Sequence, residues 1–167
     1  MFSTQTLQPH EITSRFPEIR EAFFSGDLEE IERHFEGHHD GSSTTVLGYD
    51  DERLVGIVTI RWNSQYPTFK EQGIPLIQNI EIRWEDRGKG YGDRMMAAAE
   101  EAISERSDRA GICVGIFDAY GPAQRLYATR GYIPDGRGVC LDHTPLQQGQ
   151  AVTVDHDLLL WLVKRLR

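Results

Sequence analysis

The sequence has few cysteines and no long apolar run. Its 167 residues include two cysteines, Cys113 and Cys140, which lie far apart in the chain and in no metal-ligating spacing. We therefore expect reduced thiols and no metal site. No apolar stretch approaches the roughly 18–20 residues that span a bilayer, and residues 1–15 lack the apolar core of a signal peptide. These absences predict a cytoplasmic protein without a membrane partner.

Positive charge is also scarce. The formal net charge is −8, and Lys and Arg form no basic block. Because nucleic-acid binding depends on clustered positive charge that neutralises phosphates, we expect no nucleic-acid partner. If the protein binds a charged partner, a cation suits its net charge better than an anion.

The chain does contain enough apolar sequence for one domain. Hydrophobic residues make up 39% of it, and no repeat or linker divides it, so we interpret residues 1–167 as a single domain. Periodicity and turn residues predict one or two helices in 9–39, with a break at Ser25-Gly26-Asp27, and then a hairpin with strands near 45–47 and 54–62. A strand in 74–84, a helix from Asp93 to about Arg106 and a buried strand over 110–117 are expected next. The chain is expected to end with a short helix over 122–129, a loop over 134–150 and a last strand in 151–163. This order predicts an α/β fold on a mixed sheet that is mainly antiparallel.

Three histidines lie near the expected end of the helical region, in the segment RHFEGHHDG. His34 and His38 have the i, i+4 spacing of a pair of metal ligands, but we expect Gly37 to interrupt the helix, and no third ligand is evident. We interpret this segment as a solvated turn.

Three glycines, Gly88, Gly90 and Gly92, alternate where an apolar strand leads into a strong helix. Glycine is the poorest ordinary helix former, about 1 kcal/mol worse than alanine, so three in a plain turn would be unusual. At a helix N-terminus, however, glycines let a phosphate approach unpaired backbone N–H groups. With Arg87 and Lys89 adding positive charge, the segment predicts an anion site. It matches neither the G-x-G-x-x-G dinucleotide pattern nor the P-loop pattern.

The segment RGKGYG, residues 87–92, resembles the R/Q-x-x-G-x-G/A signature of the GNAT superfamily of N-acetyltransferases. A second segment, YGPAQRLYATRGYIPDG over 120–136, is similar to that family's second motif. The two motifs occur in the family's order, with one helix and one apolar strand between them, and the resemblance covers roughly residues 45–140. It implies a GNAT-like mixed, mostly antiparallel sheet of about six to seven strands flanked by helices. It also implies acetyl-coenzyme A (acetyl-CoA) as cosubstrate.

The resemblance implies which residues bind the cosubstrate. They are Ile82, Arg83, Arg87, Gly88, Lys89, Gly90, Tyr91, Gly92, Tyr120 and Ala123. In the family, the amides of the glycine loop bind the pyrophosphate. Backbone N–H groups near Ile82 and Arg83, beside a β-bulge, face the pantetheine and the thioester carbonyl. Tyr120 departs from the pattern, because many members have Asn at that position.

Two residues are implied to be catalytic. Tyr127 is the expected proton donor to the leaving thiolate; without its flanking motif it would be interpreted as a packing residue on a short helix. Glu81 is the candidate general base, as the only carboxylate on the motif strand. Strand alternation also allows Glu81 to face solvent or a neighbouring helix, and a water chain could remove the proton instead.

We therefore expect an N-acetyltransferase that transfers an acetyl group from acetyl-CoA to a primary amine of a small molecule or protein by direct attack. Asp118, Asp135, Asp142 and Asp155, with the negative net charge, favour a cationic acceptor. The alternative is a catalytically weak binding module that holds acyl-CoA as a sensor or scaffold. The acceptor's identity, the length of the acyl group and the formation of a homodimer stay open.

Overall fold

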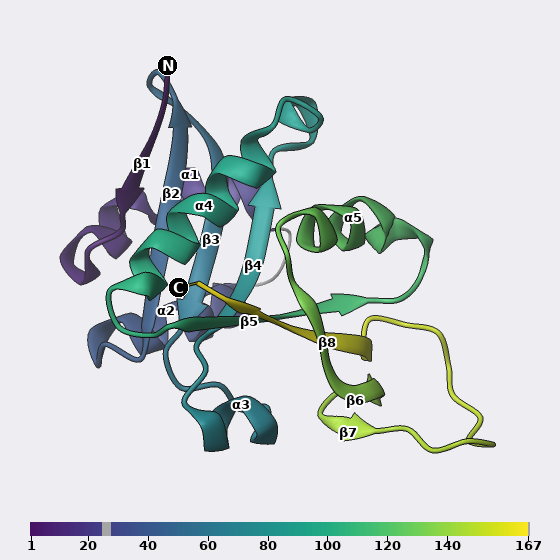
Figure 1. The fold of residues 1–167 in the computed structure, drawn as a ribbon. Coiled ribbons are helices and arrows are strands. Elements are labelled where there is room, and N and C mark those ends of the chain that lie inside the picture. Colours follow the sequence, from purple (N-terminus) through teal and green to yellow (C-terminus); the bar gives the residue numbers. More distant parts are fainter. Residues whose placement is uncertain (25–27, 167) are drawn as a thin grey trace.

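A computed structural model describes residues 1–24 and 28–166. The predicted break at Ser25-Gly26-Asp27 lies outside these residues. The described chain forms one mixed sheet of eight strands in the order β1-β2-β3-β4-β5-β8-β6-β7 (Figure 1). The strands are β1 (Phe2–Thr6), β2 (Ser43–Asp50), β3 (Arg53–Arg61), β4 (Leu76–Ile82), β5 (Arg109–Gly115), β6 (Ile133–Leu141), β7 (Thr144–Pro145) and β8 (Leu158–Arg165). The predicted α/β class is confirmed, with slightly more strands than expected.

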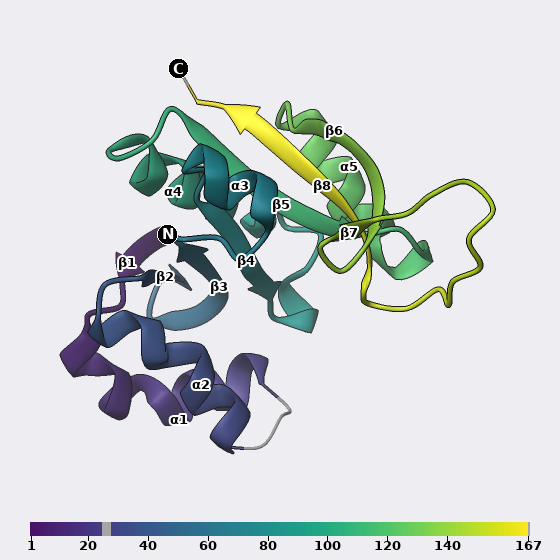
Figure 2. The same cartoon turned by 90° about the horizontal axis from the view of Figure 1, so that it is seen from below.

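Helices cover both faces of the sheet formed by β1–β4 (Figure 2). The helices are α1 (Ile12–Phe23), α2 (Leu28–His39), α3 (Pro67–Gln72), α4 (Tyr91–Ser104) and α5 (Gly121–Thr129). Strand alternation separates two cores: Leu47 and Ile57 pack with residues of α1 and α2, whereas Val58 packs with α4. A third cluster joins Phe69 of α3 to Trp161 of β8. Among the described helices, none is both long and apolar enough to cross a bilayer.

The strands β4 and β5 form the parallel pair of the sheet, and they stay together only briefly. Leu76 pairs with Gly111 and Ile77 with Ile112, and the described ladder then ends. Beyond these pairs the two strands diverge, and α5 lies beside the opening (Figure 1). The C-terminal half of β4 is therefore paired with β3 on one side and open on the other.

The structure corrects the predicted loop over 134–150, which contains most of β6 and all of β7. Pro134 pairs with Leu162, but the next pair of β6 with β8 begins at Val139, so the residues between them form a wide bulge. Gly136 and Gly138 have positive φ angles within this bulge. Proline and glycine mark bulges as well as loops, which is why the composition was misleading. The last strand also begins later than predicted, at residue 158.

The interpretation of the histidine segment as a solvated turn is wrong. Helix α2 continues through Gly37 and ends at His39. Glycine is needed because a Cβ at position 37 would lie 2.6 Å from Ser43 Oγ, where the helix approaches β2. His38 is 3% exposed, and its ring hydrogen-bonds inside the protein. Across residues 1–24 and 28–166, no cluster of His, Cys, Asp and Glu side chains could hold a metal ion.

Candidate active site

A β-bulge distorts β4 beside the opening of the sheet. Gln78 lies opposite Thr59 but Glu81 lies opposite Ile57, so β4 carries one residue more than β3 over this stretch. Asn79 takes up the difference with a φ angle of +50°. A bulge of this kind twists a strand and redirects its amides. The bulge implied by the family resemblance is present, and it lies just before Ile82.

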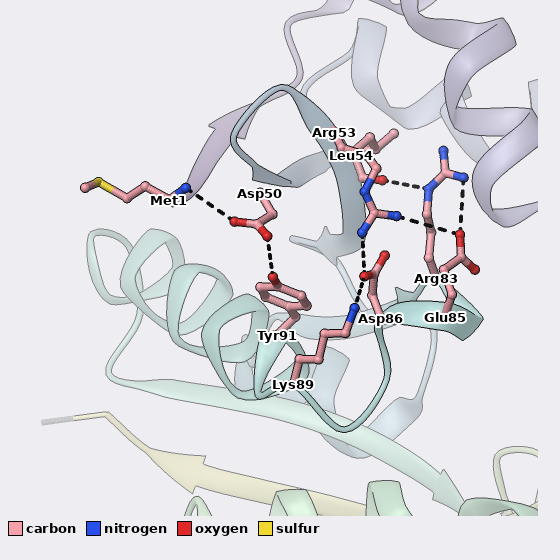
Figure 3. Close-up of polar contacts among 9 residues, drawn as sticks. All are labelled: Met1, Asp50, Arg53, Leu54, Arg83, Glu85, Asp86, Lys89 and Tyr91. Atoms are coloured by element: carbon pink, nitrogen blue, oxygen red, sulfur yellow. Dashed lines mark hydrogen bonds and ion pairs between the residues drawn. The ribbon is translucent and has the colours of Figure 1, made fainter.

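Ile82 and Arg83 present their amides to opposite sides. The Arg83 N–H donates to the Val55 carbonyl of β3 at 3.0 Å. This amide is therefore already used, which removes it from the expected set of thioester donors. Because N–H directions alternate along a strand, the Ile82 N–H points toward the open side. The Arg83 side chain is also used, since its Nε donates to the Leu54 carbonyl at 2.7 Å (Figure 3).

The glycine turn ends β4 and begins α4 with its amides unpaired. Gly88 and Gly90 have φ angles of +77° and +83°, a left-handed conformation that favours glycine. The first N–H of this region with a backbone acceptor is that of Arg94, which donates to the Gly90 carbonyl. In the described chain, the N–H groups from residue 88 to residue 93 have no acceptor. They form the positive end of a 14-residue helix, where an anion binds favourably.

Ion pairs tie this turn to the β2–β3 hairpin (Figure 3). The Asp86 carboxylate is fully buried and accepts from Arg53 at 2.5 Å and Lys89 at 2.8 Å. These two cations hold the pKa of Asp86 below its ordinary value. Tyr91 donates to Asp50 at 2.7 Å, which raises the pKa of the phenol. Lys89 therefore supports the turn through Asp86 instead of offering an unpaired charge to an anion.

A cleft of about 550 Å³ follows the turn and the opening of the sheet. It brings together residues from both motifs: Glu81, Ile82, Arg87, Gly88, Tyr91, Gly92, Tyr120 and Ala123. Asp86, Ile80, Ala119 and Pro122 complete its walls. Arg83, Lys89, Gly90 and Tyr127 do not line it. The predicted cosubstrate residues thus gather on one cleft, although the two motifs lie about 30 residues apart in the chain.

Tyr120 lies across the end of β5. A Cβ at Gly115 would come within 2.3 Å of its ring, so glycine is required where the ring packs on the strand. The Tyr120 hydroxyl lies 2.9 Å from His156 Nδ1. Phe117 packs edge-on against the same ring, with centroids 4.9 Å apart. The position that carries Asn in many relatives is therefore a fixed aromatic wall of the cleft.

Helix α5 holds Tyr127 one turn beyond Ala123, which lines the cleft. Tyr127 is 5% exposed, and burial raises the pKa of its phenol above the ordinary value, with further contributions from Cys113 and Glu81. Within the described residues its hydroxyl makes no hydrogen bond, and it is not among the fully enclosed oxygens, so its proton is not committed to a protein acceptor. A phenol of this kind stays protonated at neutral pH and can donate.

An ion-pair cluster fixes α5 against α4. Arg130 donates to Glu100 at 2.7 Å and to Asp93 at 2.6 Å. Lys164 of β8 reaches the same Glu100 carboxylate at 2.8 Å. Because Glu100 and Arg130 are largely buried, these contacts restrain the helix that carries Tyr127 relative to the glycine turn.

Glu81 lies on the opposite face of β4 from its neighbours Ile80 and Ile82. Its partner in the ladder, Ile57, packs with α1 and α2, whereas the two isoleucines pack toward α4. The Glu81 side chain is 49% exposed and lies 3.7 Å from Arg87 Nη2. Burial raises the pKa of this carboxyl, and the charge of Arg87 opposes the shift. A raised pKa suits a general base near neutral pH.

Comparison with protein families identifies the class of protein that has this fold and cleft. The match is to the family described as "Acetyltransferase (GNAT) family", and it covers residues 10–132. The chain therefore belongs to the GNAT acetyltransferase family, whose members are acyltransferases. A comparison with curated proteins found no match.

Solved structures share the fold. A SpeG spermidine N-acetyltransferase chimera from Vibrio cholerae and hSSAT has a TM-score of 0.68 at 13% identity, with 99% of this chain and 95% of that chain covered. An N-acetyltransferase from Staphylococcus aureus Mu50 has a TM-score of 0.68 at 13% identity, with 100% and 99% covered. Nourseothricin acetyltransferase has 24% identity and a TM-score of 0.54, with 77% and 68% covered.

Several residues at the site carried no signal in the sequence. Asn79 and Asp86 stand in the segment that resembles the family's fourth strand and its approach to the glycine turn, but the resemblance assigns neither a role, and His156 stands in no motif. Asp86 looks like an ordinary surface charge until the hairpin brings Arg53 to it. Asn79 looks like a strand residue until its positive φ angle is known.

Proposed function

We propose that the protein is an N-acetyltransferase that transfers the acetyl group of acetyl-CoA to a primary amine by direct attack. The observation that carries the proposal is the row of unpaired amides at the start of α4, beside a cleft that leads to the bulged strand β4. Acetyl-CoA would supply an acetyl group activated as a thioester. The residues present fit it, because the space beside the Cα atoms of Gly88 and Gly90 is open.

Each expected role follows from the chemistry of the group that would perform it. The amides of the turn over 88–92 would hold the diphosphate, and Tyr120 and Ala123 would line the path of the pantetheine arm. The Ile82 N–H would stabilise charge on the thioester oxygen, a contribution of ~3–4 kcal/mol for a preorganised donor. Tyr127 would protonate the leaving thiolate, and Glu81 would take the proton of the amine.

The acceptor in this proposal is a cationic amine. The net charge of −8 and the exposed Glu81 carboxylate support it, because negative charge attracts an ammonium group and this carboxylate lies on the side of β4 that faces α1 and α2. One structural neighbour is a spermidine acetyltransferase, and for that reason polyamines come first among the amines to test.

A second candidate function is a binding module that holds acyl-CoA without turnover. One observation favours it: Tyr127 is 5% exposed and is not among the residues that line the cleft, so little of the expected acid is accessible. In this case the protein would bind acetyl-CoA but release no thiol with any amine.

The two functions are distinguished by measuring binding and turnover on the same preparation. Calorimetric titration with acetyl-CoA, with competition by CoA, tests the cleft. Thiol release with polyamines, aminoglycosides and amino acids tests transfer. Thiol release with an amine, together with the acetylated amine by mass spectrometry, supports the enzyme. Binding without release supports the module, and absence of binding refutes both.

A further inference from the structure

A hydrogen-bonded chain of side chains begins at the bulge of β4. Asn79 Nδ2 lies 2.9 Å from His34 Nδ1 on helix α2. On the other side of the ring, His34 Nε2 lies 3.1 Å from Thr59 Oγ1 on β3. Asn79 is exposed and Thr59 is fully buried, so the chain runs from the surface of the bulge into the core.

The chain continues through β2 and returns to α2. Thr59 Oγ1 lies 2.7 Å from Thr45 Oγ1, and Thr45 Oγ1 lies 2.8 Å from His38 Nε2. At its end, His38 Nδ1 lies 3.2 Å from the backbone carbonyl of Phe35. We call these five side chains, Asn79, His34, Thr59, Thr45 and His38, the histidine–threonine chain.

The far end of the histidine–threonine chain fixes the direction of every hydrogen bond in it. The Phe35 carbonyl can only accept, so His38 must carry its proton on Nδ1 and accept at Nε2. Thr45 then donates to His38, Thr59 donates to Thr45, and His34 donates from Nε2 to Thr59.

One orientation of the Asn79 amide follows. His34 Nδ1 is left with a lone pair, which accepts from the Nδ2 group of Asn79. With the amide reversed, every bond would reverse, and the His38 Nδ1 lone pair would face the Phe35 carbonyl. Two opposed acceptors repel, so the reversed chain is disfavoured. The Asn79 Oδ1 atom is therefore held pointing away from His34, and no described group donates to it.

The location of Asn79 matters because α4 covers one face of β4 and α2 covers the other. Gly92 of α4 and Ala123 of α5 reach the cleft from the α4 side of the sheet. Asn79 bonds to α2 on the other face, and its neighbours Ile80 and Glu81 line the cleft. Asn79 itself stands just outside the lining of the cleft, so a nucleophile that reaches Glu81 along the α2 face of β4 would pass Asn79 first.

We propose that Asn79 Oδ1 accepts a hydrogen bond from the attacking amine and that His34 is the positioning residue that orients this amide. The inference rests on the proposed function and extends it to the acceptor. It assigns to the α2 face of the bulge a subsite for a primary amine or ammonium group, which is a hydrogen-bond donor and matches an amide oxygen. The other members of the chain hold the His34 ring in one tautomer.

His34 is suited to orientation and not to proton removal. Burial, followed by the charges of His38 and Arg61, lowers its pKa to about 4. The ring is therefore neutral at physiological pH and too weak a base to compete with Glu81. A neutral ring with a fixed tautomer is what a stable donor–acceptor chain requires.

The orientation can be tested without any measurement of activity. Nitrogen NMR of the full chain at pH 7 reports which ring nitrogen of each histidine carries the proton. We expect His34 protonated on Nε2 and His38 on Nδ1. The opposite pair of tautomers would mean that the Asn79 amide presents its NH₂ group to the acceptor, and this result would overturn the proposal.

The contact with the amine is tested by steady-state kinetics with an amine that the wild type acetylates. Asn79→Gly removes the amide and keeps a residue that tolerates the φ angle of +50°. We expect kcat/KM for the amine to fall about 10- to 100-fold, the value of a hydrogen bond to a charged group, with the Kd for acetyl-CoA within about twofold. His34→Ala should give a similar loss, and His34→Gln, which keeps an acceptor for Asn79, should restore part of it.

A matched control and two outcomes complete the test. His39→Ala changes an exposed histidine on the same helix outside the chain and should leave both constants unchanged. An active wild type with unaltered kcat/KM in Asn79→Gly would overturn this inference and leave the proposed function intact. A wild type that binds acetyl-CoA but acetylates no amine would overturn both.

Discussion

Replacing Tyr127 by phenylalanine separates the chemistry proposed for α5 from the stability of the fold. The substitution removes one oxygen and keeps the ring that packs in the main core at 5% exposure. No described group hydrogen-bonds to the hydroxyl, so the change leaves no protein donor or acceptor unpaired. We expect the free energy of unfolding to change by less than about 1 kcal/mol.

Turnover should respond far more strongly. General acid catalysis contributes ~10²–10⁴-fold, and a thiol with a pKa of ~8.5 needs only modest help to leave. We therefore expect kcat to fall about 10²-fold, which corresponds to about 2.7 kcal/mol of transition-state stabilisation. The Kd for acetyl-CoA should stay within about twofold, because the hydroxyl is proposed to act on the leaving thiolate and not on the bound thioester.

Tyr132→Phe provides the matched control. The Tyr132 hydroxyl is buried, and its ring packs edge-on against Tyr127 with centroids 6.2 Å apart. Urea unfolding, acetyl-CoA titration and thiol release should agree for Tyr132→Phe and the wild type. An equal loss of kcat in both variants, or a loss of acetyl-CoA affinity in Tyr127→Phe that accounts for its lower rate, would refute the assignment of Tyr127 as the acid.

Three further predictions concern the turn and the base. Gly90→Ala places a Cβ at a φ angle of +83° and should lower the free energy of unfolding by ~1–2 kcal/mol and weaken acetyl-CoA binding. Gly92→Ala, which introduces no such strain, should not lower the free energy of unfolding; urea unfolding compares the two variants, and calorimetry measures acetyl-CoA binding to Gly90→Ala. Glu81→Gln should lower kcat by about 10- to 100-fold and remove the rise of the rate with pH, since only the deprotonated carboxylate accepts a proton. The pH–rate profiles of the variant and the wild type test this expectation. Asp86 has a lowered pKa in the folded state, so its stabilising contribution is present above the unfolded-state value of ~3.9 and is lost as the pH falls through its folded value. The acid side of the melting-temperature profile should therefore be flatter in Asp86→Asn than in the wild type.

Some features of this fold could be predicted from the sequence because a short segment of the chain determines them by itself. The glycine turn could be predicted because left-handed φ angles at Gly88 and Gly90 and unpaired helix N–H groups are properties of a short segment. Helix α4 and the buried strand β5 followed from their apolar patterns, and both were found within a few residues of the predicted bounds. The gathering of both motifs on one cleft followed from the family resemblance.

Other features depend on which segments meet. The strand β6 forms because it pairs with β8 across a bulge, and residues 134–138 have no periodicity that would predict a strand. His34 and His38 appeared to belong to a solvated turn because their partners, Asn79 and Thr45, stand on strands that only the folded sheet brings against α2. Sequence reasoning also could not tell that Lys89 is paired with a buried Asp86.

The sequence by itself determined the conformation of the glycine turn and the strand, helix and strand around it, because backbone preference and apolar spacing act over a few residues. Tertiary structure alone decided the bulge of β4, the direction of the Ile82 and Arg83 amides, and the orientation of the Asn79 side chain. Each of these depends on a hydrogen-bond partner that the sheet brings from another strand or helix. The preference of a residue for a kind of partner is local, whereas the identity of that partner depends on which strands and helices lie beside it in the folded protein.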